Sequence, residues 1–407
     1  MSGIKTGNDA ELLQLLRPGM TVYIAGSSGE PTRALEILAA APQRCAGINF
    51  ITSFVPGINR FDLSTLGQEA QFTVFFMHPS LHKPEAEGRV RLLDIPYSKI
   101  ARWLQDHPPD LVIAQLSANS ESGFFSLGPA VEFMPIVLRN ATRRVAILNQ
   151  QTPWLKGSVS YPSSDFDLVL ESDSALPQYA DPGIDSRYRQ MGNLVAGLIS
   201  NGATLQTGLG QAPAAVLNAL HSHRNLKLHT GVFSDSLLRL IDAGSMDLNR
   251  PLLTGVAAGS GAFYARLKAF PGIQYAPVTQ THRSEALRGI ECFFTINSAI
   301  EVDLQGNLNA EYLGNRRFSG RGGLPDFVSG GHLSAGGASI IVLPSSHSSG
   351  TKTRIVKELA MPATVPGQWV DYVITEHGCA SLKGKNSNER AEALCAIAAP
   401  ELKDVLC

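Results

Sequence analysis

The sequence has almost no net charge and no long apolar run. Its 407 residues include 34 basic and 35 acidic side chains, which gives a formal charge of -1. Such a balance lacks the excess of Lys and Arg that proteins use to bind nucleic acids or anionic membranes. The longest apolar stretches, such as 338–343, have the length of a strand, far short of the roughly 20 residues that span a bilayer. Nucleic-acid and membrane partners are therefore not expected.

Features typical of secreted and metal-binding proteins are missing too. The first 20 residues contain no apolar stretch behind a basic start, so no secretory signal is visible and we expect a cytoplasmic protein. Cysteines are few, odd in number and never arranged as a CxxC pair, which excludes a disulfide framework and a zinc site. We expect reduced thiols and no metal site; the cysteines are Cys45, Cys292, Cys379, Cys395 and Cys407.

Glycine, proline and apolar residues are abundant by contrast. The sequence has 38 Gly and 24 Pro, 44% hydrophobic residues and only 17% charged residues, which indicates a compact chain with many turns rather than a disordered one. The length favours two domains over one. Short apolar runs alternate with helical patterns, as in TVYIAG followed by PTRALEILAAA, and this alternation predicts a mainly parallel α/β fold.

Two segments share one pattern of strand, glycine turn, proline and helix. They are 21–38 and 204–220, with Pro31 and Pro213 at equivalent places in the first helical turn. We infer two similarly built open α/β domains, 1–185 and 186–407. Ligands of such folds bind at the carboxyl ends of the strands or between domains, so the glycine turns are the first candidates for a site.

Three groups of residues fit an anion site or a catalytic carboxylate. The turn Gly208-Leu209-Gly210-Gln211-Ala212 opens a helix, whose N–H groups can receive an anion or oxyanion, although a turn without a ligand has the same pattern. Glu30 occupies the matching turn of the first half and is either a catalytic group or a partner of the helix dipole. Glu376 ends a predicted strand and is either a site residue or a structural one.

A third glycine cluster lies at Gly320, Gly322 and Gly323, where a ligand can approach the backbone closely. Arg321, with two neighbouring arginines, is suited to binding a carboxylate or phosphate. A solvated basic loop is the alternative interpretation.

Taken together, these motifs resemble the acetyl-CoA hydrolase/4-hydroxybutyrate CoA-transferase family, a branch of the class I CoA-transferases. The likeness covers nearly the whole chain, with GEPTRAL, NGATLQTGLGQAP, HTGVFSDSLLRLIDAG, SGRGGLPDF and VDYVITEHG in this order. It implies two α/β domains facing across a CoA cleft, and exchange of CoA between an acyl-CoA thioester and a free carboxylic acid. The substrates are then the partners, no other cofactor or metal is implied, and the family suggests a homodimer or higher homo-oligomer.

The resemblance also implies roles for individual residues. The turn 208–212 and the loop 320–323 are expected to hold CoA and the reacting acyl oxygen. Family members carry a nucleophilic glutamate in an H-T-E motif, where this sequence has Gly231. His229 stands beside this glycine, and His282 lies where relatives tend to have asparagine. We expect these three residues, with Arg321, to bind the substrate acid.

Three explanations of the missing glutamate remain open. The first is a relocated nucleophile, Glu30 or Glu376. The second is direct attack by the carboxylate of the acceptor acid. The third is loss of activity, which leaves a CoA-binding protein. We expect a CoA-transferase that acts on a short-chain acyl-CoA such as succinyl-CoA and accepts a dicarboxylate, because bidentate arginine contacts suit a second carboxylate. The sequence also looks like the itaconate CoA-transferase branch, and an acyl-CoA thioesterase is the alternative enzyme.

Overall fold

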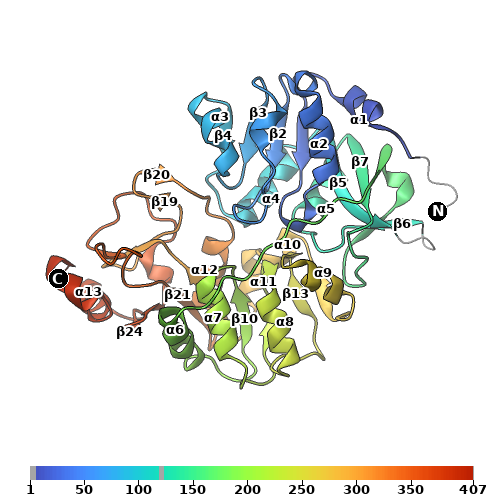
Figure 1. Cartoon of the computed structure of the whole chain (residues 1–407). Helices are drawn as coiled ribbons and strands as arrows, with labels where there is room; N and C mark the ends of the chain where they lie inside the picture. Colours follow the sequence, from blue (N-terminus) through green and yellow to red (C-terminus); the bar gives the residue numbers. More distant parts are fainter. Residues whose placement is uncertain (1–5, 119–122, 407) are drawn as a thin grey trace. The chain divides into compact units, whose positions relative to one another are not determined.

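The computed structural model describes residues 6–118 and 123–406, which form two compact units (Figure 1). The first unit comprises Met1–Ile95, Lys99–Ala180 and Thr254–Thr279, and the second comprises Pro96–Ser98, Asp181–Leu253 and Gln280–Cys407. The first unit thus takes in a segment from the second half of the sequence. The simpler division at residue 185 stays a prediction.

The first unit is built on a parallel sheet with helices around it. In order across the sheet its parallel strands are β4 (Val90–Leu92), β3 (Gln71–Val74), β2 (Asn49–Thr52), β1 (Thr21–Ile24), β5 (Leu111–Ala118), β7 (Arg143–Asn149) and β9 (Leu168–Ser172). An antiparallel branch extends from β5 through β6 (Phe124–Ser126) and β8 (Ser160–Pro162). The longer helices are α1 (Asp9–Leu15), α2 (Thr32–Ala40), α4 (Tyr97–Asp106), α5 (Met134–Asn140) and α9 (Gly261–Leu267).

The second unit has a six-stranded sheet of the same kind. In order its strands are β11 (Lys227–Leu228), β10 (Thr204–Thr207), β16 (Phe293–Ser298), β21 (Ala338–Val342), β23 (Tyr372–Thr375) and β24 (Gly378–Ser381). All neighbours are parallel except β23 and β24. The longer helices are α6 (Ser186–Ala196), α7 (Gln211–Ala219), α8 (Asp235–Asp242), α12 (Leu324–Leu333) and α13 (Ser387–Ala396).

Shorter elements complete the described chain. They are α3 (His82–Ala86), β12 (Val232–Phe233), β13 (Leu252–Thr254), β14 (Val256–Ala257), β15 (Ile273–Tyr275), α10 (Val278–Thr281), α11 (Ser284–Arg288), β17 (Glu301–Asp303), β18 (Leu308–Asn309), β19 (Tyr312–Leu313), β20 (Arg316–Arg317), β22 (Ile355–Val356) and α14 (Lys403–Leu406). No helix within residues 6–118 and 123–406 is both long and apolar enough to cross a membrane.

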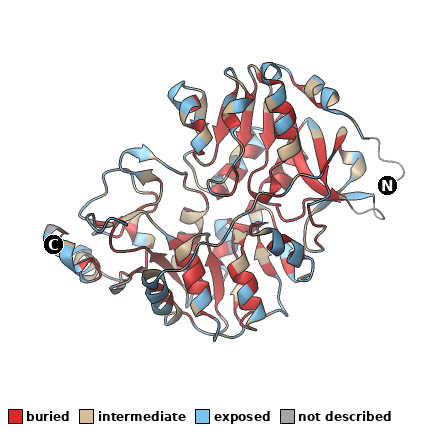
Figure 2. Ribbon diagram, viewed as in Figure 1, coloured by how far each residue is buried: buried red, intermediate tan, exposed pale blue. Residues whose placement is uncertain are grey.

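The two sheets are buried in the same way. Figure 2 shows the central strands of each unit as buried and the outer faces of the helices as exposed. Within each sheet a buried Gln and a buried Asn pair across neighbouring strands. Gln115 on β5 accepts a hydrogen bond of 2.9 Å from Asn149 on β7, and Gln206 on β10 exchanges two with Asn297 on β16. These amide pairs hold adjacent strand ends in register.

The predicted α/β class is confirmed. Both repeated segments form a strand, a turn and a helix, namely β1 with α2 and β10 with α7. Helix α6, just after the predicted boundary, begins at Ser186, because Asp185 caps it by accepting from the N–H of Tyr188.

The prediction of reduced thiols is wrong for one cysteine. Cys45, Cys292 and Cys379 are free, while Cys395 is disulfide-bonded. Cys407 lies outside the described residues. Wide spacing in the sequence does not reveal which thiols the fold brings close.

A fully buried carboxylate joins three elements of the second unit. Asp371 accepts hydrogen bonds from the N–H of Ser339, at 2.9 Å, and from Nδ1 of His332, at 2.8 Å. We predict that Asp371→Ala lowers the free energy of unfolding by about 3 kcal/mol, because a buried N–H loses its charged acceptor. Urea denaturation measures this. Asp106→Ala, at an exposed ion pair with Arg102, is the control and should change little; equal effects would contradict the assignment.

Candidate active site

Most of the predicted site residues lie at one edge of the second unit's sheet. Gly208 follows β10, Gly231 lies three residues after β11, and Glu376 follows β23. Since β11, β10, β16, β21 and β23 are parallel, their carboxyl ends share an edge. Ligands of open α/β sheets bind at this edge. The parallel pairing therefore brings residues from distant parts of the sequence to one place.

The turn 208–212 presents free backbone donors. Gly210 has φ of +118°, which glycine adopts without strain, and precedes α7. Within the described residues no acceptor binds the N–H groups of residues 208–212. The hydroxyl of Thr207, just before the turn, is buried and has no partner among the described residues. This local structure fits an anion or oxyanion, as the sequence predicted.

The turn after β11 is tied to the turn after β10. The Thr230 hydroxyl donates to the carbonyl of Thr207 at 2.8 Å and accepts from its N–H at 3.3 Å. Gly208 and Gly231 each follow one member of this pair. The two glycines are therefore adjacent in space, although the chain separates them by more than 20 residues.

The ring of His282 fills the space that side chains at two of the glycines would need. A Cβ atom on Gly231 would lie 3.2 Å from Cε1 and from Nε2 of His282, and one on Gly323 would lie 2.4 Å from Nε2. Phe327 packs against the same ring, with centroids 4.5 Å apart. The structure thus joins Gly231, Gly323 and His282, which sequence reasoning named separately. Their mutual contact was missed, because nothing in the spacing indicates it.

Both histidines of this region are held by the segment around Thr281. Nε2 of His229 donates to the Thr281 carbonyl at 2.9 Å, and Nδ1 of His282 lies 2.8 Å from the Thr281 hydroxyl. Burial lowers the pKa of His229, and it lowers the pKa of His282 to about 3, with a smaller contribution from His229. Both rings are neutral at physiological pH. Nε2 of His229 is therefore occupied by a backbone contact, and the predicted contact of His229 with the substrate acid stays a prediction.

Arg321 is engaged with the protein itself. Its guanidinium lies 3.9 Å from the carboxylate of Glu311 and donates to the carbonyl of Thr364 at 3.3 Å. Glu311 is almost fully buried and also pairs with Arg317. Arg317 and Arg321 therefore balance the negative charge of the buried Glu311 carboxylate. The predicted contact of Arg321 with a substrate carboxylate stays a prediction.

Glu376 is likewise engaged. Its two carboxylate oxygens accept from the N–H of Ser345 at 2.9 Å and from the Ser345 hydroxyl at 3.0 Å. This contact holds the loop after β21 against the end of β23. A structural use of Glu376 was one of the two interpretations of the sequence, and these contacts favour it.

Glu30 has a different environment, in the first unit. Its side chain is 4% exposed and accepts from Nδ2 of Asn59, at 2.9 Å, and from the Thr32 hydroxyl, at 3.1 Å. Burial raises the pKa of the Glu30 carboxyl, and these hydrogen bonds offset part of the rise. Asn59 also binds the N–H and carbonyl of Ser27, whose φ is +51°. The turn that carries Glu30 is thus held in a strained conformation by one amide.

Glu30 lines a pocket of about 510 Å³ within the first unit. Arg60 borders the same pocket and has no ion-pair partner among the described residues. The other lining residues are Thr32, Ile58, Phe61, Ala175, Leu176, Pro177, Gln178, Ala180 and Ser260. Sequence reasoning missed Arg60; its place one residue after Asn59 gives no local indication of a site.

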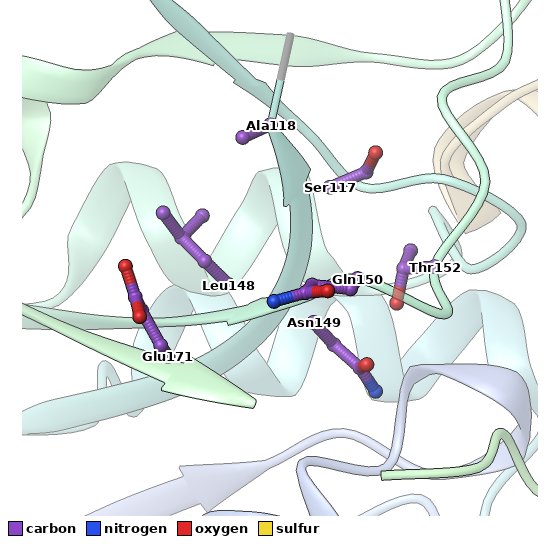
Figure 3. A pocket seen from close by; sticks show the side chains of 7 residues that line it. All are labelled: Ser117, Ala118, Leu148, Asn149, Gln150, Thr152 and Glu171. Atoms are coloured by element: carbon purple, nitrogen blue, oxygen red, sulfur yellow. The ribbon is translucent and has the colours of Figure 1, made fainter. Parts of the chain in front are cut away.

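A smaller pocket, of about 90 Å³, lies at the carboxyl ends of β5, β7 and β9 (Figure 3). Seven side chains surround it: Ser117, Ala118, Leu148, Asn149, Gln150, Thr152 and Glu171. The Thr152 hydroxyl is buried without a partner among the described residues. Its size suits water rather than a substrate. In the part of the chain that the structure describes, no group of three or more His, Cys, Asp or Glu is placed to hold a metal ion.

The contact between Gly323 and the His282 ring gives a prediction about stability. Gly323→Ala should lower the free energy of unfolding by about 1–3 kcal/mol, because a Cβ 2.4 Å from Nε2 forces the packed ring to move. Gly208→Ala is the matched control, since no atom lies within 4 Å of its added Cβ. Thermal and urea denaturation of both variants measure the difference. A Gly323→Ala protein as stable as the control would show that the ring is not confined.

Comparisons with known proteins identify the family of the chain. Family models described as the acetyl-CoA hydrolase/transferase N-terminal and C-terminal domains match residues 5–176 and 259–407. The 4-hydroxybutyrate coenzyme A transferase of Clostridium kluyveri is 27% identical over 95% of this chain and 92% of its own. The butyryl-CoA:acetate CoA-transferase of Anaerostipes caccae is 31% identical over 79% of this chain and 76% of its own.

A solved structure has the same fold. The crystal structure of RipA from Yersinia pestis superimposes with a TM-score of 0.91 at 25% identity, and the match covers 98% of this chain and 96% of RipA. The two domain models together match most of the sequence, and they do so in the order of the chain. The protein therefore belongs to the acetyl-CoA hydrolase/transferase family.

Proposed function

We propose that the protein is a CoA-transferase that moves CoA from a short-chain acyl-CoA, such as succinyl-CoA, to a small carboxylic acid. Membership of a family whose curated members include CoA-transferases supports the reaction class. The observation that carries the proposal to particular residues is the turn 208–212, whose backbone N–H groups have no acceptor in the described chain. Such donors stabilise the oxyanion that forms when a carboxylate attacks a thioester.

Gly231 supplies no carboxylate, so the attacking group must come from elsewhere. Both glutamates accept hydrogen bonds at both oxygens, and Glu30 is the better candidate because it lines a pocket of substrate size. The Glu30 carboxylate attacks the thioester carbonyl and expels CoA thiolate, which leaves a mixed anhydride. The thiolate then attacks the glutamyl carbonyl, releasing the donor acid and forming a glutamyl-CoA thioester. The carboxylate of the acceptor acid then attacks the glutamyl-CoA thioester, and the same two steps in reverse regenerate Glu30 and release the new acyl-CoA.

Desolvation of Glu30 serves this chemistry. A carboxylate that gives up water on burial is a stronger nucleophile, and the amide of Asn59 together with the Thr32 hydroxyl keeps it oriented. The raised pKa of the Glu30 carboxyl also makes its ionised form sensitive to mildly acidic solution. The transfer rate should accordingly fall as the pH is lowered toward the pKa of Glu30.

We further propose a dicarboxylate such as itaconate as the acceptor. Arg60 borders the pocket of Glu30 and pairs with no carboxylate of the described chain, so it is available to bind the second carboxylate of the acid. Arg321, the cation expected from the sequence, is weaker support, since Glu311 and the Thr364 carbonyl already bind it.

The nucleophile is tested by trapping. After incubation with acyl-CoA, borohydride reduction and peptide mass spectrometry should locate an adduct on Glu30, and Glu30→Gln should lose the adduct and about 10³-fold or more of the transfer rate. Glu376→Gln is the control and should keep the adduct. Transfer without any adduct would show direct attack by the acceptor acid instead.

The same reaction mixtures distinguish the alternatives to transfer. Release of free CoA at the same rate with and without an acceptor acid would identify a thioesterase. An acyl-CoA that binds but remains intact under both conditions would identify a CoA-binding protein without activity.

The acceptor is tested by a change of charge at the pocket. Arg60→Leu should raise KM for a dicarboxylate about 10-fold or more, with little change for acetate, because only the dicarboxylate has a second charge to lose. Arg321→Leu should affect both acids alike. Steady-state kinetics with itaconate, succinate and acetate provide the measurement, and an equal effect of Arg60→Leu on all three would remove it as the second-carboxylate contact.

A further inference from the structure

The imidazole of His282 has one nitrogen in use and one without a partner. Nδ1 lies 2.8 Å from the Thr281 hydroxyl, whereas no described residue forms a hydrogen bond with Nε2. The side chain is 4% exposed and packs against the rings of Phe327 and Tyr97. Nε2 is not one of the fully buried side-chain atoms that lack a partner, so it keeps some exposure and is open to a hydrogen bond with a bound molecule.

The unpaired nitrogen lies against the two glycines that border the predicted acyl site. It would be 3.2 Å from a Cβ on Gly231 and 2.4 Å from one on Gly323, and both glycines are partly exposed. Gly231 follows Thr230, whose hydroxyl binds the backbone of Thr207. Gly231, which lies beside Nε2, is thus linked to the turn 208–212 through the hydrogen bonds between Thr230 and Thr207. The N–H groups of that turn are free.

The contact with Thr281 fits either neutral tautomer. When the Thr281 hydroxyl donates to Nδ1, the single proton of the neutral ring lies on Nε2, which is then a donor; this is the tautomer that the proposal requires. A neutral imidazole with a lowered pKa is a known form of electrophilic catalyst, because it donates a hydrogen bond at every pH at which the enzyme works. The titratable groups that face the ring are His229 and the phenol of Tyr97.

We propose that Nε2 of His282 donates a hydrogen bond to the acyl oxygen of the bound thioester, so that His282 is the side-chain donor that accompanies the backbone donors of the turn 208–212. The inference rests on the proposed function, because it needs an acyl-CoA as substrate. Glycine at 231 and 323 then has a positive role, since a Cβ at 323 would displace the ring and a Cβ at 231 would crowd it. No bond to the ring is made or broken; the donor stabilises the negative charge on oxygen during attack.

The test compares two variants of similar size. His282→Phe keeps the packing and removes the donor, while His282→Gln places an amide N–H near the position of Nε2. We expect His282→Phe to lower kcat for CoA transfer about 100-fold with little change in KM, and His282→Gln to restore about 10-fold of that loss. A His282→Phe enzyme with the kcat of the unmodified protein would overturn the proposal and leave a purely space-filling ring.

If the variants do not fold, the tautomer of His282 in the unmodified protein tests the proposal. Nitrogen NMR of protein labelled with ¹⁵N-histidine distinguishes the two neutral tautomers, and we expect the proton of His282 on Nε2. A proton on Nδ1 would overturn the proposal. Failure of the proposed function has a different signature: the unmodified protein would then transfer no CoA to any acid, whatever the tautomer of His282.

Discussion

Parallel strand pairing is the constraint on which the rest of the second unit depends. The register of β10 with β16, and of β16 with β21, brings strand ends from residues 207, 298 and 342 to one edge. Buried amides of Gln206 and Asn297 then lock two of these ends together. The turns at Gly208 and Gly231 begin at strand ends whose positions are fixed by the sheet. Short loops are therefore enough to place backbone donors and glycines next to one another.

At that edge, residues 231 and 282 compete for the same space. A Cβ on residue 231 would lie 3.2 Å from the ring of His282, so a larger side chain at 231 would require the ring to shift. A carboxylate and a neutral imidazole do different work: the first attacks a carbonyl carbon, whereas the second can only assist at the carbonyl oxygen. In the proposed mechanism, attack and stabilisation are therefore carried by different groups, and the buried carboxylate of Glu30 is the proposed nucleophile.

Much of the fold followed from the sequence, and less of the site did. Alternating apolar runs and helical patterns predicted the parallel sheets, and the turn at Gly208 was recognisable because its neighbours are local in sequence. Arg321 contacts Glu311, and Glu376 contacts Ser345, across distant segments of the chain. Residue type alone does not reveal such contacts, so the sequence suggested a substrate contact for Arg321 and a nucleophile for Glu376. The ring of His282 reaches Gly231 across about fifty residues, and no periodicity reports such a contact.

The tight fit between residue 323 and the ring also bears on how this arrangement can arise. A histidine that appears at 282 while residue 323 still carries a side chain meets it at 2.4 Å, so such a protein is overpacked. A side chain at 323 and the ring at 282 are thus compatible only if the surrounding residues repack. The effects of substitutions at these two positions should therefore not add, because each position limits the volume that the other can hold.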